Sequence, residues 1–147
     1  MPRWAQGKYQ IKNPEKYIGK RQPIYRSSWE LTAMMLFDNN DNIKQWASEA
    51  IQIPYRNPLT GKQTMYVPDF LIVYEDLDGN KKVELIEIKP SHETSVIKAK
   101  DNRNRLVAGK NLAKWGAAQA YCARNGITFR VITEHQIFAQ SGKNNKR

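Results

Sequence analysis

The chain has 147 residues, which is enough for one domain built around a single hydrophobic core. Hydrophobic residues make up 40% of it, and no apolar run approaches the ~20 residues that a membrane-spanning helix needs. Its single cysteine, Cys122, excludes an internal disulfide and a cysteine-based zinc site. We therefore expect a reduced globular protein that does not enter membranes.

Charge is distributed unevenly along the chain, which has 24 basic and 14 acidic residues and a net charge of +10. Residues 1–26 carry +6, residues 98–114 carry +5 and the tail 141–147 carries +3, whereas residues 27–97 carry −5. Basic flanks bind polyanions by counterion release, and clustered carboxylates bind hard cations. This pattern favours a polyanion-binding protein with a metal site. A globular domain with basic tails is the simpler explanation of the same charges.

The predicted elements begin after residues 1–26, which lack periodicity and form an extended or partly disordered basic arm. A helix is expected to begin at Ser27 and to run through Phe37, and a short helix is expected over 41–49. The strands expected next cover residues 51–55, 69–75 and 82–89, with turns at 57–62 and 76–80.

A long helix over 100–124 follows, ended by Asn125-Gly126, and the last expected strand covers 127–133. Small residues recur along this helix at helical spacing, among them Gly109, Gly116 and Ala120, and they favour close packing on a sheet. The order is αβββαβ, which predicts an α/β (α+β) fold with a central mixed sheet flanked by helices. We divide the chain into the arm 1–26, a domain 27–140 and the tail 141–147.

Two carboxylates and an ammonium are expected on one face of the hairpin over residues 69–89. Asp69 and Glu87 lie symmetrically about Asp78, the centre of the turn, so a loop of three or five residues places them opposite one another. Like charges at such a pair destabilise a sheet unless a cation lies between them. Lys89, two residues beyond Glu87, points to the same face. A simple ion pair of Lys89 with either carboxylate is the structural alternative.

Glu30 is a candidate for a third acidic ligand. It is the only charged residue between Ser27 and Phe37, and a carboxylate in an apolar segment is costly unless it is paired or metal-bound. The alternative is a capping box, in which Glu30 reaches back to the amide of Ser27. The two roles are compatible with one another.

These residues resemble the PD-(D/E)xK nuclease superfamily, through Pro68-Asp69, Glu87-Ile88-Lys89 and the upstream acid Glu30. The basic arm with the stretch 25–30 around Arg26, followed by residues 67–70 and 87–90, looks like the head-completion nucleases of large contractile-tailed phages, which are related to TnsA-type transposon endonucleases. The resemblance covers roughly residues 27–133 and implies a restriction-endonuclease-like core. It also implies hydrolysis of DNA phosphodiesters, in endonuclease or exonuclease mode.

By this resemblance, Glu30, Asp69, Glu87 and Lys89 are catalytic. The metal would be Mg²⁺, with Mn²⁺ as a substitute, held by Glu30, Asp69, Glu87 and the backbone carbonyl of Ile88. Lys89 would orient or deprotonate the attacking water, or stabilise the charge that develops on the phosphate. Nothing in the sequence indicates a nucleotide cofactor.

Double-stranded DNA is the expected substrate, with phage head or neck proteins as partners, in the host cytoplasm or on the virion. Residues expected to contact DNA phosphates are Arg26, Arg103, Lys110 and Lys114, although a solvated helix face explains the last three equally well. Two alternative functions stay open. One is a non-enzymatic head or neck assembly protein on a nuclease fold, and the other is a transposon, restriction or junction-resolving endonuclease.

Overall fold

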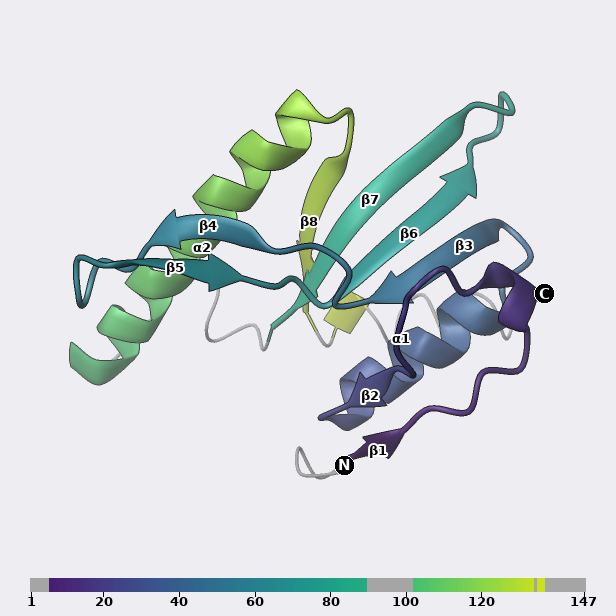
Figure 1. Ribbon diagram of the computed structural model, residues 1–147, viewed down its shortest axis with the longest axis horizontal. Coiled ribbons are helices and arrows are strands. Elements are labelled where there is room, and N and C mark those ends of the chain that lie inside the picture. The colour runs from purple at the N-terminus through teal and green to yellow at the C-terminus, as the bar shows by residue number, and fades with distance from the viewer. Residues whose placement is uncertain (1–5, 90–101, 134, 137–147) are drawn as a thin grey trace.

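The structure is a computed structural model that describes residues 6–89, 102–133 and 135–136 (Figure 1). The predicted tail 141–147 therefore lies outside the described residues. The first elements are β1 (Gly7–Lys8), the 3-10 helix η1 (Pro14–Lys16), β2 (Ile24–Tyr25) and α1 (Ser28–Asn39). Five strands follow: β3 (Ile43–Ser48), β4 (Ile53–Arg56), β5 (Gln63–Tyr66), β6 (Phe70–Glu75) and β7 (Lys81–Ile88). The last two elements are α2 (Asn102–Arg124) and β8 (Thr128–Ile132).

A four-stranded mixed sheet forms the centre of the molecule, in the order β3-β6-β7-β8. The first three strands are antiparallel, and β8 is parallel to β7. Because α1 precedes β3 and α2 lies between β7 and β8 in the chain, the sheet and its two helices follow an αβββαβ order. The predicted fold class is confirmed, and the architecture is consistent with a restriction-endonuclease-like core.

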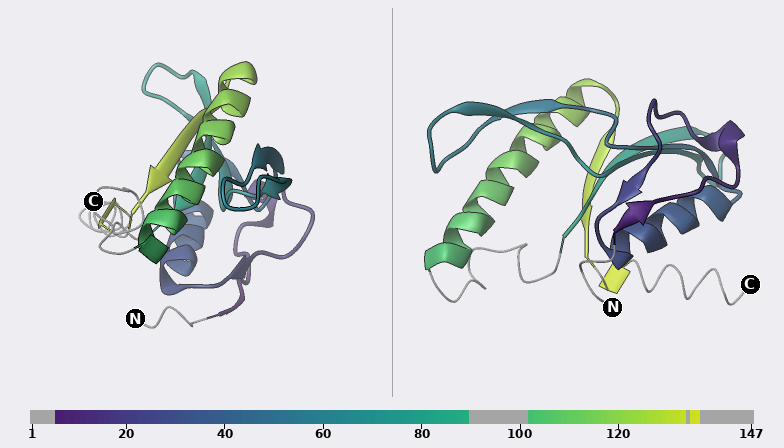
Figure 2. Two further views of the ribbon diagram at one scale, coloured as in Figure 1. Left: turned by 90° about the vertical axis from the view of Figure 1, so that its left-hand side faces the viewer. Right: turned by 60° about the horizontal axis from the view of Figure 1, so that its bottom comes forward.

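Each face of the sheet has its own hydrophobic layer, one that includes α1 and one that includes α2; the ribbons of both helices are drawn in Figures 1 and 2. On one face, Met34 and Phe37 of α1 pack against strand residues such as Ile86. On the other face, Trp115 of α2 packs with its neighbours from the strands, among them Leu85. Successive residues of β7 thus enter different layers, as the alternation of a strand requires. The same alternation places Glu87 on the α2 side.

The buried face of α2 differs from the predicted one. Ala108, Trp115 and Ala118 are buried, whereas Gly116 and Ala120 are exposed. The small residues recur at helical spacing on more than one side of this helix, so their spacing alone does not identify the packed side. None of the helices among the described residues is long and apolar enough to cross a bilayer.

The hairpin of β6 and β7 has the predicted register. Its pairs run from Phe70–Ile86 to Glu75–Lys81, around a loop over 76–80. Two amides of that loop donate to Oδ1 of Asp76, and Gly79 adopts a φ of 82° that favours glycine. Continued by one residue toward the open end, the same register places Asp69 opposite Glu87.

The prediction of a short helix over 41–49 is wrong, because residues 43–48 form the edge strand β3. β3 pairs with β6 along its length, and Trp46 and Ala47 are buried. Considered alone, the polar residues of this stretch are compatible with a short helix. Pairing with β6 and burial of Trp46 decide for the strand, which is a tertiary effect that a local pattern does not contain.

The strand expected over 51–55 also has a different place from the one predicted. It forms β4 and pairs with β5, outside the central sheet. The resulting two-stranded ribbon lies beside α2 (Figure 2) and contributes Tyr55 and Tyr66 to the layer on that face. The first of the three strands between α1 and α2 in the central sheet is therefore β3, and not the strand expected over 51–55.

Residues 6–26 differ from the expected extended arm, since they contain β1, η1 and β2 and pack on the domain. The anchor is Asp38 of α1, a fully buried aspartate. Its carboxylate accepts hydrogen bonds from the Tyr9 hydroxyl (2.7 Å) and from the amides of Lys12 (2.8 Å) and Asn13 (3.1 Å). These contacts link the basic segment to the helix that follows it.

Candidate active site

Asp69 lies immediately before β6, at the end of the hairpin remote from its loop. The amide of Ile88 donates to Oδ2 of Asp69 across the ladder, at 2.8 Å. The backbone carbonyl of Asp69 accepts from the amide of Glu49 on the other side, at 2.9 Å. Asp69 is thus fixed between β3 and β7 by backbone contacts on both sides.

Glu87 belongs to β7 and is 5% exposed. Its Oε2 lies 3.7 Å from Nζ of Lys89, which shares its face of the strand. Its Oε1 is buried and makes no hydrogen bond of full geometry among the described residues, although the Tyr66 hydroxyl is near enough for hydrogen bonding to lower the pKa of Glu87. Since a buried charged oxygen without a full hydrogen bond is costly, this atom is suited to an additional cationic or hydrogen-bonding ligand.

The two carboxylates oppose one another electrostatically. Burial raises the pKa of Asp69 well above its usual value, the facing Glu87 raises it further, and the Ile88 amide opposes the shift. Burial also raises the pKa of Glu87, against the attraction of Lys89. Repulsion of this kind is relieved by a proton or by a cation bound between the groups.

Ser27 caps the start of α1 as expected, but the predicted capping box is not formed, because the Glu30 carboxylate reaches the amide of Arg26 and not that of Ser27. The amide of Glu30 donates to Oγ of Ser27 (3.1 Å), and Oε1 of Glu30 accepts from the amide of Arg26 (3.3 Å). Burial raises the pKa of Glu30, and its charge is close enough to Asp69 to raise the pKa of that residue as well. The Ser27 cap is therefore present, and the Glu30 carboxylate lies toward the Asp69–Glu87 pair.

A group of three or more acidic, histidine or cysteine side chains close enough to share a metal is absent from the described residues. The structure brings Asp69, Glu87 and Lys89 together, but it does not place Glu30 with them as a ready ligand. Ile88 is the last residue of β7, between Glu87 and Lys89 in the chain, and its amide contacts Asp69. Two facing carboxylates, one with a buried oxygen that makes no full hydrogen bond, nevertheless suit a hard cation such as Mg²⁺, which prefers oxygen ligands and retains several waters.

The predicted DNA-contacting residues fall into different settings. Lys110 and Lys114 are partly buried residues of α2, one helical turn apart. Burial and the charges of Lys89 and Lys110 lower the pKa of Lys114, and the charges of Glu87 and Asp69 oppose that shift, so Lys114 lies near the two carboxylates. Arg103 lies in the first turns of α2, and its side chain is outside the described part of the structure.

Arg26 forms an ion pair with Glu49, with Nη1 and Oε2 3.2 Å apart. Glu49 is a residue that sequence reasoning missed, although its amide contacts Asp69 and its charge raises the pKa of Glu30. It has a φ of 51°, in the left-handed region that a glutamate rarely adopts. Its position depends on β3, so no signal in the sequence could have indicated it.

Tyr66, the last residue of β5, was also missed. Its buried hydroxyl makes no hydrogen bond of full geometry among the described residues, although Glu87 and Trp115 are near enough for hydrogen bonding to act on its pKa. Burial raises the pKa of Tyr66, and the adjacent Glu87 carboxylate raises it further. The one signal available was its position three residues before Asp69, which is compatible with many other roles.

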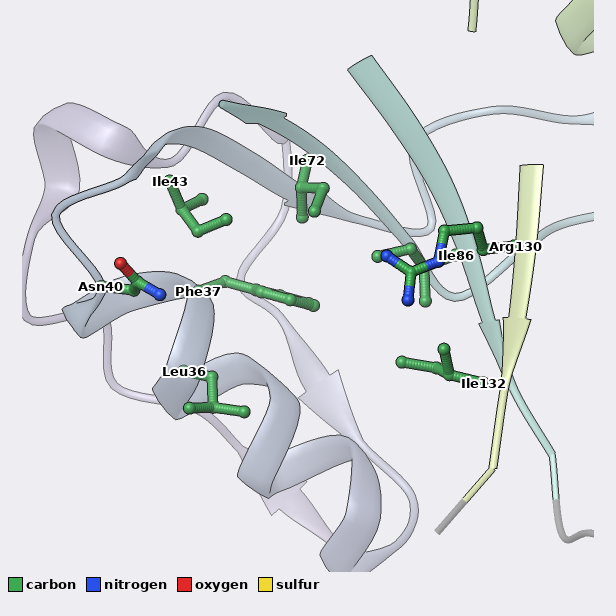
Figure 3. A pocket seen from close by; sticks show the side chains of 8 residues that line it. All are labelled: Leu36, Phe37, Asn40, Ile43, Ile72, Ile86, Arg130 and Ile132. Carbon is green, nitrogen blue, oxygen red and sulfur yellow. The ribbon is translucent and has the colours of Figure 1, made fainter. Parts of the chain in front are cut away.

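A pocket of about 60 Å³ lies elsewhere, between α1 and the sheet (Figure 3). Its walls are mostly aliphatic and aromatic, with Asn40 and Arg130 as the polar members. Arg130 is already paired with Glu84, at 2.9 Å. This pocket contains none of the predicted site residues, so the carboxylate pair and its lysines are the stronger candidate site.

Comparison with known proteins agrees with this geometry. The family profile described as TnsA-like endonuclease N terminal matches residues 40–134, the range that contains Asp69, Glu87 and Lys89. The chain is also 35% identical over 142 residues to the head completion nuclease of Enterobacteria phage T4, covering 90% of this chain and 93% of that protein. Both relatives support a nuclease role. The chain belongs to the TnsA-like endonuclease family.

Proposed function

We propose that this protein is a Mg²⁺-dependent DNA nuclease that hydrolyses phosphodiester bonds during phage head completion. The observation that carries the proposal is the pair Asp69 and Glu87, which face one another in the hairpin register beside Lys89. An acid pair of this kind weakens a fold unless it binds something positive. Membership of an endonuclease family supplies the reaction that such a pair would serve.

Asp69 and Glu87 would hold the metal, with Glu30 and the Ile88 carbonyl as further oxygen ligands. When bound, Mg²⁺ or Mn²⁺ supplies Lewis-acid stabilisation of the phosphate. The protein's own contribution is to fix the two carboxylates through the Ile88 amide and the sheet register. Lys89 presents an ammonium beside Glu87, where it either orients the attacking water or stabilises developing negative charge.

DNA is the proposed substrate because basic residues surround this acidic site. Lys110 and Lys114 lie on the same side of the sheet as Glu87, and the whole chain carries a net charge of +10. Together with Arg26 and Arg103, they would contact backbone phosphates of double-stranded DNA without reading its sequence. Pairing of Arg26 with Glu49 lowers its expected contribution below that of the lysines.

The biological setting proposed is completion of the phage head, in the host cytoplasm or on the virion, with head or neck proteins as partners. This rests on the 35% identity, along nearly the whole chain, with a protein named head completion nuclease. The β1–β2 segment, which is fixed to α1 through Asp38, offers a structured rather than an extended surface for such a partner.

The test is cleavage of supercoiled and linear plasmid DNA by the full chain in Mg²⁺ or Mn²⁺. Asp69→Ala and Lys89→Ala should each lower the cleavage rate by about 10³-fold or more while DNA binding is retained. Asp78→Ala and Lys81→Ala, at the exposed loop end of the same hairpin, are matched controls and should cleave normally. If pure wild type never nicks DNA with either metal, a non-enzymatic assembly role replaces this proposal.

A further inference from the structure

Lys114 is held against an aromatic ring at the edge of the candidate active site. Its Nζ lies 5.4 Å from the ring centroid of Tyr66, within the range of a cation–π contact. Tyr66 ends β5 and is 3% exposed, so the ring provides a fixed surface for the lysine. A surface lysine usually keeps its ammonium in open water, and the position of Lys114 is more restricted.

Buried polar groups gather around this ring. The hydroxyl of Tyr66, Oε1 of Glu87 and Nε1 of Trp115 are all buried, and none of them makes a hydrogen bond of full geometry among the described residues. They lie close to one another, since hydrogen bonding with Glu87 and with Trp115 acts on the pKa of Tyr66. These groups therefore partly satisfy one another, and they form a polar wall beside Lys114.

Three lysines and two carboxylates lie close together at this place. Lys114 shares its surroundings with Lys89 and Lys110, and mutual repulsion together with burial disfavours its charged form. The same surroundings contain Asp69 and Glu87, whose charges the proposed metal would neutralise. With that metal bound, the carboxylates no longer balance the ammonium groups, and an anion would do so.

Resting on the proposed nuclease function, we propose that Lys114 is a second active-site cation that binds the phosphate being cleaved, in addition to Lys89. The phosphate of a DNA strand is the anion that the nuclease would bring to this place. Lys89 approaches the site from β7, and Lys114 approaches it from α2. An ammonium on each side of the phosphate would stabilise the charge that builds up on its oxygens as the bond to the leaving group breaks.

Lys114→Met is the decisive variant, because methionine keeps the apolar contact with Tyr66 and removes the charge. Lys114→Arg keeps the charge and the ability to stack on the ring. Lys81→Met, at the far loop end of the hairpin, is the matched control for loss of one surface lysine. For each full-length variant, thermal unfolding, DNA affinity and the single-turnover cleavage rate at saturating plasmid DNA are measured in Mg²⁺.

We expect Lys114→Met to lower the single-turnover rate by about 10²-fold while its DNA affinity changes by less than about threefold. Lys114→Arg should recover at least a tenth of the wild-type rate, and Lys81→Met should match wild type. A folded Lys114→Met that cleaves at the wild-type rate overturns the inference and leaves the nuclease function intact. Weaker binding with an unchanged rate at saturation overturns it too, since Lys114 would then contact phosphates away from the cut. A wild type that does not cleave overturns the proposed function itself.

Discussion

Asp38 is fully buried and Asp69 is half-buried, and their surroundings are opposite. The carboxylate of Asp38 accepts four hydrogen bonds, from Tyr9, Lys12 and both nitrogens of Asn13. The carboxylate of Asp69 accepts one among the described residues, from the Ile88 amide, and faces the charge of Glu87. The first is bound by its own fold, and the second is left with capacity for a ligand.

The pKa values of the two aspartates are shifted in opposite directions, as their different surroundings require. Burial alone would raise the pKa of Asp38, but the hydrogen bonds from Lys12, Tyr9 and Asn13 outweigh it and lower the pKa. Burial raises the pKa of Asp69, and Glu87 adds to the shift. A buried carboxylate whose hydrogen bonds are all made within the protein has a structural role. A carboxylate with a raised pKa beside a second acid is typical of a functional site.

The largest effect on stability is expected at Asp38. Asp38→Asn replaces one carboxylate oxygen with an NH₂ group, which would face the hydrogen-bond donors that now bond to the carboxylate. The free energy of unfolding should therefore fall by about 3 kcal/mol. Urea denaturation measures it, with Asp41→Asn on the exposed surface nearby as a control within about 0.5 kcal/mol of wild type. A loss below about 1 kcal/mol at Asp38 would mean that the network contributes little to docking residues 6–26.

A metal should stabilise the fold by binding to Asp69 and Glu87. Asp38 should take no part in this stabilisation. At Mg²⁺ concentrations about 100 times its Kd, the free energy of unfolding should rise by about 2.7 kcal/mol in wild type. Asp69→Asn should lose that gain, whereas Asp41→Asn keeps it. Thermal unfolding with and without Mg²⁺ measures it, and equal gains in wild type and Asp69→Asn would contradict metal binding at this pair.

Whether a contact of these two aspartates could be predicted from the sequence depends on how far apart its residues lie in the chain. The opposition of Asp69 and Glu87 follows from local facts, namely the loop centred on Asp78 and the alternation of two adjacent strands, and the register is as predicted. Ser27 at the N-cap of α1 is likewise a local signal, and its cap is observed. Local patterns of this kind were enough to bring the hairpin residues together.

The network of Asp38 and the contact of Lys114 with Tyr66 have no such local basis. Asp38 receives its partners from residues 25 to 29 positions earlier, and Lys114 is 48 residues from Tyr66 in the chain. The same limit explains β3, which is a strand because β6 pairs with it and buries Trp46. Such contacts arise from packing, which the periodicity of a short segment does not encode.

The pH dependence of stability should separate the two aspartates without metal. Because the pKa of Asp69 is raised, the folded state keeps a proton that the unfolded chain has released above about pH 4, and stability falls as the pH rises through the raised pKa. Asp38 acts in the opposite direction, since its contribution is complete above about pH 4 and is lost as the pH falls through its lowered pKa.

Urea denaturation in EDTA between about pH 4 and pH 8 tests this for wild type and Asp69→Asn. The stability of Asp69→Asn relative to wild type should increase with pH, by an amount on the order of 1 kcal/mol, because the variant has no charge to bury and none to repel Glu87. Asp41→Asn should show no such trend. A constant difference between Asp69→Asn and wild type over the whole range would contradict a raised pKa of Asp69.

The smallest effect is expected at Glu30, where it decides between a cap and a ligand. Ser27→Ala removes the side-chain acceptor of the Glu30 amide and should cost about 1 kcal/mol of stability, as for other N-caps. Glu30→Gln keeps an oxygen able to accept from the Arg26 amide, so its cost should stay below about 0.5 kcal/mol. A capping residue alone would leave cleavage of DNA unchanged in Glu30→Gln. We expect instead a loss of about tenfold or more, because the variant removes a charge that acts on Asp69 while the helix start is preserved.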